Sequence, residues 1–321
     1  SWLEPGAEPP DRPHLCVPAA ALVPGIGLAP LVAAAPGRIL ASSRDSDAPV
    51  TTLAPDRLQP LWRALAGGVA VGDDLRRSLA DAIVVPPSPG AWYVRVRTAA
   101  AAAEAEHALY MSLGSPIDTP LDVALHRRLS RPVTRAAVGA GISPNTLSIG
   151  SLALGLGAAA LFALGSIVST LAGMLLYVAG VVLDHADGEV ARVTYAESRL
   201  GGILDVAVDT VVHTVLVLAM GVAAQRIAGG GSALLGVAAA AGIAGSAVVT
   251  QRWPVTAPGA AGRLLARIGT RDLYYAMLLA FIAARATVPP ALPGLMLLIA
   301  LGAHAYWVGR LTQRPARATE H

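Results

Sequence analysis

The stretch LDHADGEVARVTYAESRLGGILDVAVD, Leu183–Asp209, places four aspartates within sequence that is otherwise rich in Leu, Val, Ala and Gly. Asp184 and Asp187 are three residues apart, and Asp205 and Asp209 are four apart. In helical conformation the two members of each pair therefore share one helix face. Ionisable groups in apolar sequence are costly and are usually functional. Both the fold and the function of the chain have to account for this stretch.

The composition of the chain is that of a membrane protein. Of its 321 residues, 54% are hydrophobic and only 14% are charged, which predicts an α-helical membrane protein. The single cysteine, Cys16, excludes an internal disulfide framework and fits a soluble part that faces the cytoplasm. The net charge of +3 does not require nucleic acid as a partner, because arginines beside spans set orientation and meet lipid headgroups or substrate phosphates.

Residues 1–113 are punctuated by proline and mixed in polarity, which predicts a small cytoplasmic α/β domain. Asp81–Val85 and the alternating Trp92–Val96 are typical of strands, and Ala99–Leu113 is rich in helix-forming residues. The region contains no Gly-rich phosphate loop followed by Lys.

Residues 114–142 are predicted to form an amphipathic helix next to the membrane. Apolar Leu121, Val123, Leu125, Leu129, Val133 and Ala136 alternate with Arg127, Arg128, Arg131 and Arg135. Such a helix lies on the membrane surface, with its apolar face in the lipid and its guanidinium groups toward phosphates. An ordinary amphipathic linker helix is the alternative.

Residues 143–310 are predicted to form a domain of six transmembrane helices, followed by a cytoplasmic tail at 311–321. Ser143 and Pro144 are a favourable helix start. Six apolar segments, each near the ~20 residues needed to cross a bilayer, cover 144–164, 167–190, 201–223, 232–250, 272–289 and 291–309.

The placement of arginine predicts that both termini are cytoplasmic. With the N-terminal region inside, the arginines on the cytoplasmic side are Arg127, Arg128, Arg131, Arg135, Arg192, Arg199, Arg252, Arg263, Arg267, Arg271, Arg310, Arg314 and Arg317. Only Arg226 and Arg285 fall outside, which is the asymmetry expected for a protein of the cytoplasmic membrane.

The two aspartate pairs are predicted to face each other just inside the cytoplasmic boundary, because a short cytoplasmic connection joins the second and third spans. Four carboxylates in a poorly solvated cleft need compensating cations. Hard oxygen ligands suit Mg²⁺, Mn²⁺ or Ca²⁺, and the lack of Cys or a His pair nearby argues against zinc. Two divalent cations held in this way would also bind a diphosphate and stabilise charge during its displacement.

The residues between the aspartates fit a phosphate ligand. Gly188 allows close approach to the backbone, Ala191 keeps the next turn clear, Arg192 offers a guanidinium fork, and Gly201 permits close helix packing. The alternative is that the aspartates cap helix ends or pair with Arg192 and Arg199. Four carboxylates on two helix faces make that alternative less favourable.

A family resemblance rests on these positions. The pattern Asp184-x2-Asp187-Gly188-x2-Ala191-Arg192-x8-Gly201-x3-Asp205-x3-Asp209 resembles, without gaps, the signature of the CDP-alcohol phosphotransferases. The resemblance implies a six-helix membrane fold, usually dimeric, with two divalent cations, Mg²⁺ or Mn²⁺. It also implies transfer of a substituted phosphate from a CDP-alcohol to an acceptor hydroxyl, with release of CMP.

The same resemblance implies a role for each residue of the pattern. Asp184, Asp187 and Asp205 are expected to be the principal metal ligands, and Asp209 is expected to complete the metal site and act as the catalytic base. Gly188, Ala191 and Arg192 are expected to line the CDP site together with Gly201. Asn145, in the Ser-Pro-Asn start of the first span, is a further expected nucleotide contact.

A second resemblance concerns Ser112–Ser148, which is similar to the junction in bifunctional proteins that join an inositol-phosphate cytidylyltransferase to a di-inositol-phosphate phosphate synthase. It implies that residues 1–113 are a degenerate nucleotidyltransferase-like domain. Arg97 stands where such enzymes often carry a metal-binding Asp, so we expect no CDP-inositol synthesis from this region. Thr210 stands where relatives acting on inositol phosphates often have Arg. His213 is predicted either to touch the site or to be buried and hydrogen-bonded.

The leading functional hypothesis is an integral membrane phosphotransferase of phospholipid or polyol-phosphate biosynthesis, with CDP-diacylglycerol or CDP-inositol as the type of donor. Its expected partners are the CDP-alcohol, the hydroxyl acceptor, membrane lipids and a second copy of the chain. An ion or proton transporter and an inactive membrane scaffold are the alternatives. A transporter would distribute its carboxylates along a path across the membrane, whereas here they cluster at one boundary.

Overall fold

The structure is a computed structural model that describes residues 13–17, 21–22, 31, 36–40, 50–66, 81–85, 93–115, 118–252 and 270–312. The chain divides into two compact units, Ser1–Leu113 and Gly114–His321. Arg263, Arg267, Arg314 and Arg317, and most of the predicted tail, lie outside the described residues.

The first unit contains a small sheet, as predicted for a domain of mixed α/β character. Its strands are β1 (His14–Cys16), β3 (Arg38–Leu40), β4 (Thr51–Leu53) and β5 (Ile83–Val85), in the order β1-β4-β3-β5. β4 pairs antiparallel with β1 and β3, whereas β3 and β5 are parallel. A second antiparallel pair joins β2 (Ala21–Leu22) to β6 (Val94–Arg95).

Two helices of the described residues accompany these strands in the first unit. They are α2 (Pro55–Ala66) and α4 (Ala99–Met111), and the Thr98 side chain caps α4 by accepting a hydrogen bond from the Ala101 amide. Buried Leu31, Val50 and Val85 form a small hydrophobic core. The predicted strands and helix near 81–85, 92–96 and 99–113 therefore lie where the structure has β5, β6 and α4.

Each of the six predicted apolar segments is helical in the second unit. The helices are α6 (Pro144–Leu164), α7 (Ile167–Val193), α8 (Arg199–Ala228), α9 (Ser232–Arg252), α11 (Arg271–Thr287) and α12 (Leu292–Thr312), with a 3-10 turn, η3 (Pro289–Ala291), before the last. Serine hydroxyls cap α6, α7 and α8, and Gly165 ends α6 in the left-handed conformation.

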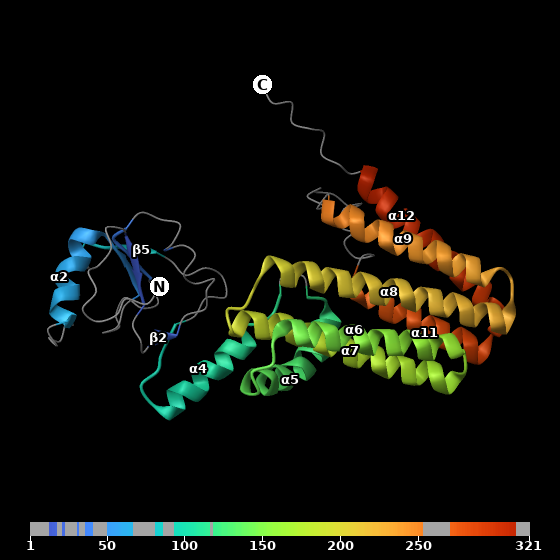
Figure 1. Cartoon of the computed structure of the whole chain (residues 1–321), viewed down its shortest axis with the longest axis horizontal. Coiled ribbons are helices and arrows are strands. Elements are labelled where there is room, and N and C mark those ends of the chain that lie inside the picture. Colours follow the sequence, from blue (N-terminus) through green and yellow to red (C-terminus); the bar gives the residue numbers. More distant parts are fainter. Residues whose placement is uncertain are drawn as a thin grey trace, which may run out of the picture. The chain divides into compact units, whose positions relative to one another are not determined.

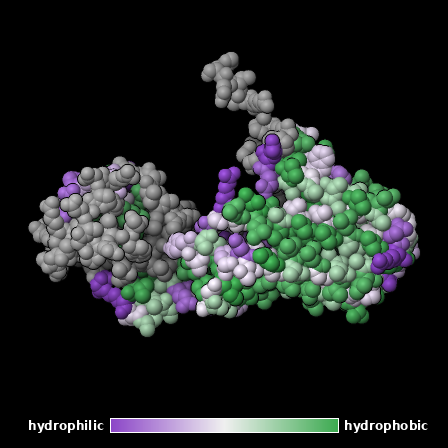
Figure 2. All heavy atoms as spheres, in the orientation of Figure 1, coloured by the Kyte–Doolittle hydropathy of each residue, from purple (hydrophilic) through white to green (hydrophobic). Residues whose placement is uncertain are grey.

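Five of the described helices are long and apolar enough to cross a membrane: α6, α7, α8, α9 and the segment Pro289–Thr312. The prediction of six spans is thus not confirmed for α11, whose 17 residues begin with Arg271 and Asp272. Many large apolar side chains on these helices are exposed, and the visible face of the unit is largely apolar (Figure 2).

The six helices pack in a closed order, α7, α6, α8, α9, α12 and α11, with α11 returning to contact α7 (Figure 1). Small residues allow the closest approaches. A Cβ on Gly155 of α6 would clash with the Val212 side chain on α8, and a Cβ on Gly221 would lie 2.7 Å from Cα of Gly236 on α9. Buried Phe162, Tyr177 and Leu216 contribute to the core between the helices.

The predicted amphipathic segment forms a π-helical turn, η2 (Asp122–His126), that continues into α5 (Arg127–Gly139). Val123, Leu125 and Leu129 are exposed, as an apolar membrane-facing side requires. The expectation for Arg127 is wrong, because this side chain is buried against α7 instead of pointing toward phosphates. Glu189 of α7 attracts it inward.

Candidate active site at the α7–α8 hairpin

A short connection sets the relative position of α7 and α8. Tyr195 takes a positive φ of 54°, and the Ala196 amide returns to the Ala191 carbonyl at 2.9 Å, which satisfies a carbonyl at the end of α7. Ser198 then caps α8 by accepting from the Gly201 amide at 3.0 Å. The last turns of α7 and the first turns of α8 consequently lie at the same depth.

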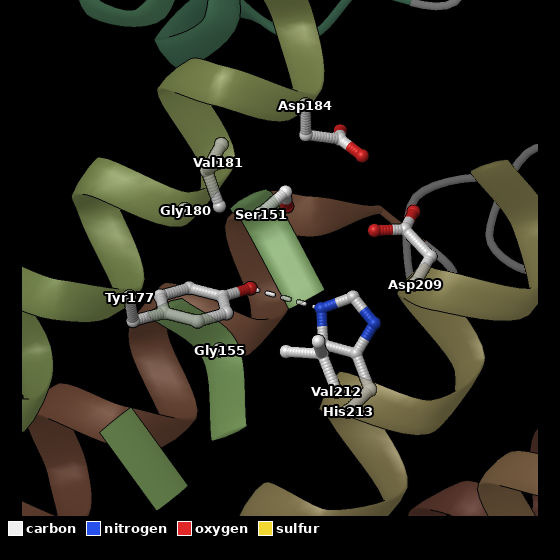
Figure 3. A pocket seen from close by; sticks show the side chains of 9 residues that line it. All are labelled: Ser151, Gly155, Tyr177, Gly180, Val181, Asp184, Asp209, Val212 and His213. Carbon is white, nitrogen blue, oxygen red and sulfur yellow. Dashed lines mark hydrogen bonds between the residues drawn. The ribbon is translucent and has the colours of Figure 1, made fainter. Parts of the chain in front are cut away.

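This arrangement brings the aspartates together. Carboxylate oxygens of Asp184, Asp187 and Asp205 all lie within 4.8 Å of one another. Asp209 faces Asp184 across the hairpin, and the two carboxylates point toward each other (Figure 3). The exposed fraction of the side chain is 8% for Asp184 and 42% for Asp209. The cluster is therefore buried on its α7 side and open on its α8 side.

Two further side chains bind the aspartates. The hydroxyl of Ser148, on α6, donates to Asp187 Oδ2 at 2.5 Å. The Nη2 group of Arg271, at the start of α11, donates to Asp184 Oδ2 at 2.7 Å and to Asp209 Oδ2 at 3.2 Å. The sequence did not indicate Ser148, and it placed Arg271 only among the arginines of the cytoplasmic side. Nothing in the local sequence indicates these contacts, which join separate helices.

The other predicted site residues lie along the same hairpin. A Cβ on Gly188 would lie 3.3 Å from Nη1 of Arg192, so the guanidinium of Arg192 covers this glycine. Asn145 is exposed, and its Oδ1 lies 3.8 Å from the position of a Cβ on Gly201. Ala191 is half-buried on the same turn as Arg192. The structure therefore places these residues beside the aspartates, with Asn145 reaching the start of α8.

A buried polar network behind Asp184 was not predicted. Asp122 Oδ1 lies 2.8 Å from Nδ1 of His126 and 3.1 Å from Nε2 of His185, and Nε2 of His126 lies 2.8 Å from the Tyr275 hydroxyl. Asp122 Oδ2 accepts from the Thr119 amide. Burial alone would raise the pKa of Asp122, but the hydrogen bonds from the two histidines and from the backbone outweigh it, so this pKa lies well below its usual range.

A second buried network attaches α5 to the signature segment. Glu189 is fully buried and accepts hydrogen bonds from Arg127 Nη1 at 2.9 Å, Ser130 Oγ at 2.8 Å and Thr134 Oγ1 at 2.6 Å. Arg127 also donates two hydrogen bonds to Asp118. Because each charge has partners, the network costs less than an isolated buried charge and fixes α5 on α7.

His213 is buried and hydrogen-bonded, with Nε2 2.9 Å from the Tyr177 hydroxyl. It also lines a small pocket that begins at Asp184 and Asp209 and runs between α6, α7 and α8 (Figure 3). The Thr210 hydroxyl donates to the Val206 carbonyl of its own helix. The pocket is lined by Ser151, Gly155, Tyr177, Gly180, Val181, Asp184, Asp209, Val212 and His213.

Comparison with known protein families agrees with this site. A family model of the CDP-alcohol phosphatidyltransferases matches residues 141–307, which is just over half of the chain. The chain belongs to the CDP-alcohol phosphatidyltransferase family. The match includes the whole α7–α8 hairpin and every residue of the signature. A comparison with curated proteins finds none that is significantly similar.

As a CDP-alcohol phosphatidyltransferase with five membrane-spanning candidates, the protein is a membrane phosphotransferase. The family uses a divalent metal ion, and the aspartate cluster offers the oxygen ligands that Mg²⁺ and Mn²⁺ prefer. The donor set and the close spacing of three carboxylates therefore fit such a cofactor. The three residues of this cluster are all aspartates.

Proposed function

We propose that the protein transfers a substituted phosphate from a CDP-alcohol to an acceptor hydroxyl and releases CMP. One observation carries the proposal. Oxygens of Asp184, Asp187 and Asp205 from two helices lie within 4.8 Å of one another, beside Gly188 and Arg192. Four aspartates at this depth need cations, and a diphosphate bound to those cations is the group that the reaction cleaves.

Asp184, Asp187, Asp205 and Asp209 would hold two divalent cations, Mg²⁺ or Mn²⁺. When bound, these ions would neutralise charge on the diphosphate and on the leaving CMP. Asp209 is the proposed general base, and its half-exposed carboxylate can accept the proton of an arriving hydroxyl. The deprotonated oxygen would attack the phosphorus attached to the alcohol, and the bond from that phosphorus to CMP would break.

Gly188, Ala191 and Arg192 are the proposed CDP contacts, together with Gly201 and Asn145. The small residues leave the backbone accessible, and Arg192 can donate paired hydrogen bonds to a phosphate. The exposed Asn145 side chain beside Gly201 supports its inclusion.

We infer six spans, with both termini and the site in the cytoplasm. The 17 residues of α11 are at the lower limit for a span, and η3 extends the helical path after it. Arg226 and Arg285 donate to the carbonyls of Ala163 and Gly165 at the far end of α6. The two arginines assigned to the outside thus lie together at the end of the bundle that is remote from the aspartates.

The donor is proposed to be of the CDP-diacylglycerol or the CDP-inositol type, and the active form is proposed to be a homodimer. The region 1–113 is proposed to be a nucleotidyltransferase-like remnant without activity.

Release of CMP from a panel of both donors, by the purified chain with Mg²⁺, tests the reaction class. Release that depends on an acceptor alcohol is expected. A folded protein that releases no CMP from any donor, but conducts cations in liposomes, would instead be a transporter.

A further inference from the structure

Arg271 occupies the position between two of the proposed metal ligands. Its Nη2 nitrogen contacts Oδ2 of Asp184 on α7 and Oδ2 of Asp209 on α8. Only 19% of the Arg271 side chain is exposed, so the guanidinium lies inside the site. A positive group that bridges two carboxylates from different helices does electrostatically what a bound cation would do.

A contact with His185 positions the guanidinium of Arg271. Nη1 of Arg271 lies 3.0 Å from Nδ1 of His185, and Nε2 of His185 lies 3.1 Å from Asp122 Oδ1. Nδ1 of His185 is also 3.0 Å from the Val181 carbonyl. Because a guanidinium can only donate, its contact with His185 is a hydrogen bond when Nδ1 carries no proton. Nε2–H then donates to Asp122, and the Val181 carbonyl is a neighbour of Nδ1 without a hydrogen bond to it.

The beginning of α11 is held at a second point. The hydroxyl of Thr119 donates to Asp272 Oδ1 at 2.7 Å, directly beside Arg271 in the sequence. Asp122, His126 and His185 offer ligand atoms within 4.8 Å of one another, but those atoms are already joined by hydrogen bonds to each other and to Tyr275. Through His185 this cluster contacts Arg271 and holds its guanidinium beside the aspartates.

We propose that Arg271 is a built-in counter-ion of the aspartate site, which a divalent cation must displace from Asp184 and Asp209. The proposal rests on the metal-binding role of these aspartates in the proposed function. Before the cation arrives, the guanidinium compensates two carboxylates that would otherwise repel each other. A guanidinium and a divalent cation on the same two oxygens would repel, so the affinity for the cation is lowered by the arginine.

The test is Mn²⁺ binding by the full chain in lipid nanodiscs, without nucleotide, measured from the electron paramagnetic resonance signal of free Mn²⁺. Arg271→Gln removes the competing charge and is expected to lower the dissociation constant at least about tenfold, since one full charge is removed at contact distance. Arg271→Lys keeps the positive charge on a shorter side chain. Its dissociation constant for Mn²⁺ should lie between those of the unmodified chain and Arg271→Gln. Arg285→Gln, at the other end of α11, is the matched control and should bind as the unmodified chain does.

Equal or weaker Mn²⁺ binding by Arg271→Gln would overturn the proposal and leave the metal site intact. Absence of Mn²⁺ binding in the unmodified chain and in both Arg271 variants would overturn the metal-binding role as well, which separates the two failures. If Arg271→Gln does not fold, the Mn²⁺ affinity of Arg271→Lys decides between the outcomes. Tighter binding than in the unmodified chain supports the counter-ion role, and unchanged or weaker binding rejects it.

Discussion

At the scale of single residues, Asp209 differs in its surroundings from Asp184 and Asp187, the two aspartates of α7. Its side chain is 42% exposed, whereas that of Asp184 is 8% exposed, and both accept from Arg271. A base that receives the proton of a hydroxyl must be reachable by the acceptor, while a ligand can be buried. The difference in exposure supports the division of roles between the two residues.

Asp209→Asn is expected to lower the rate of CMP formation by roughly 10² to 10⁴, because the general base is lost. Binding of CDP should stay within a few-fold of the unmodified chain, as the buried ligands remain. Asp184→Asn should instead weaken CDP binding through the loss of a metal ligand. Isothermal titration with CDP and a steady-state CMP assay give both quantities. A loss of CDP binding in Asp209→Asn as large as in Asp184→Asn would remove the assignment of the base.

Single residues also show what the sequence could and could not predict. The four aspartates were predictable, because helix periodicity alone places each pair on one face. The contact of Arg271 with Asp184 joins positions 87 residues apart, and that of Ser148 with Asp187 joins positions 39 apart. Such contacts depend on how the helices pack, which local pattern does not contain.

At the scale of elements, the attachment of α5 to α7 depends on buried ion pairs. Arg127 pairs with Asp118 at 2.7 Å and with Glu189 at 2.9 Å. Six apolar segments and the Ser143–Pro144 helix start predicted the helices of the second unit, but the arginines of α5 were predicted to point toward phosphates. Helix periodicity shows that one face is polar; it does not show that Glu189 lies opposite that face.

The Asp118 pair predicts acid sensitivity. Burial would raise the pKa of Asp118, but hydrogen bonds from Arg127 and the Ser115 amide outweigh it, so the folded-state pKa is below the usual value. Because its pKa is lower in the folded state, the ionised carboxylate stabilises the fold at pH values above the unfolded-state pKa of about 3.9. This stabilisation is lost as the pH falls through the folded-state pKa. The melting temperature should therefore drop between pH 6 and pH 3.5.

Asp118→Asn should have a lower melting temperature than the unmodified chain at pH 6 and should show a smaller drop at pH 3.5. Tryptophan fluorescence during heating measures both values. Asp81→Asn is the matched control, because its pair with Arg57 is exposed and is screened by solvent. A drop in Asp118→Asn equal to that of the unmodified chain would show that this carboxylate does not stabilise the fold.

At the scale of the whole molecule, the topology depends on α11. This helix carries Arg271 to the aspartates at one end, and at the other end Arg285 donates to the Gly165 carbonyl. Five helices meet the length and hydropathy of a span, and α11 is shorter. An even number of spans keeps both termini on one side of the membrane. Whether α11 crosses the membrane therefore decides whether the C-terminus lies on the same side as the N-terminus.

Cysteine labelling in a Cys16→Ser background tests the sixth span. Val288, after α11, and Glu197, between α7 and α8, are both exposed. In sealed right-side-out vesicles, a membrane-impermeant maleimide should label Val288→Cys at once and Glu197→Cys only after permeabilisation. Equal protection of both cysteines would place Val288 inside and would reduce the number of spans to five.

The central claim is that carboxylates from two neighbouring helices act together on one CDP-alcohol. Mg²⁺-dependent CMP release by the purified chain, compared with Asp187→Asn on α7 and Asp205→Asn on α8, tests it most directly. We expect release by the unmodified chain and a loss of at least about a hundredfold in each variant, since either helix alone cannot hold both cations. Release that persists in one of the variants, or no release by a folded chain from any CDP-alcohol, would contradict it.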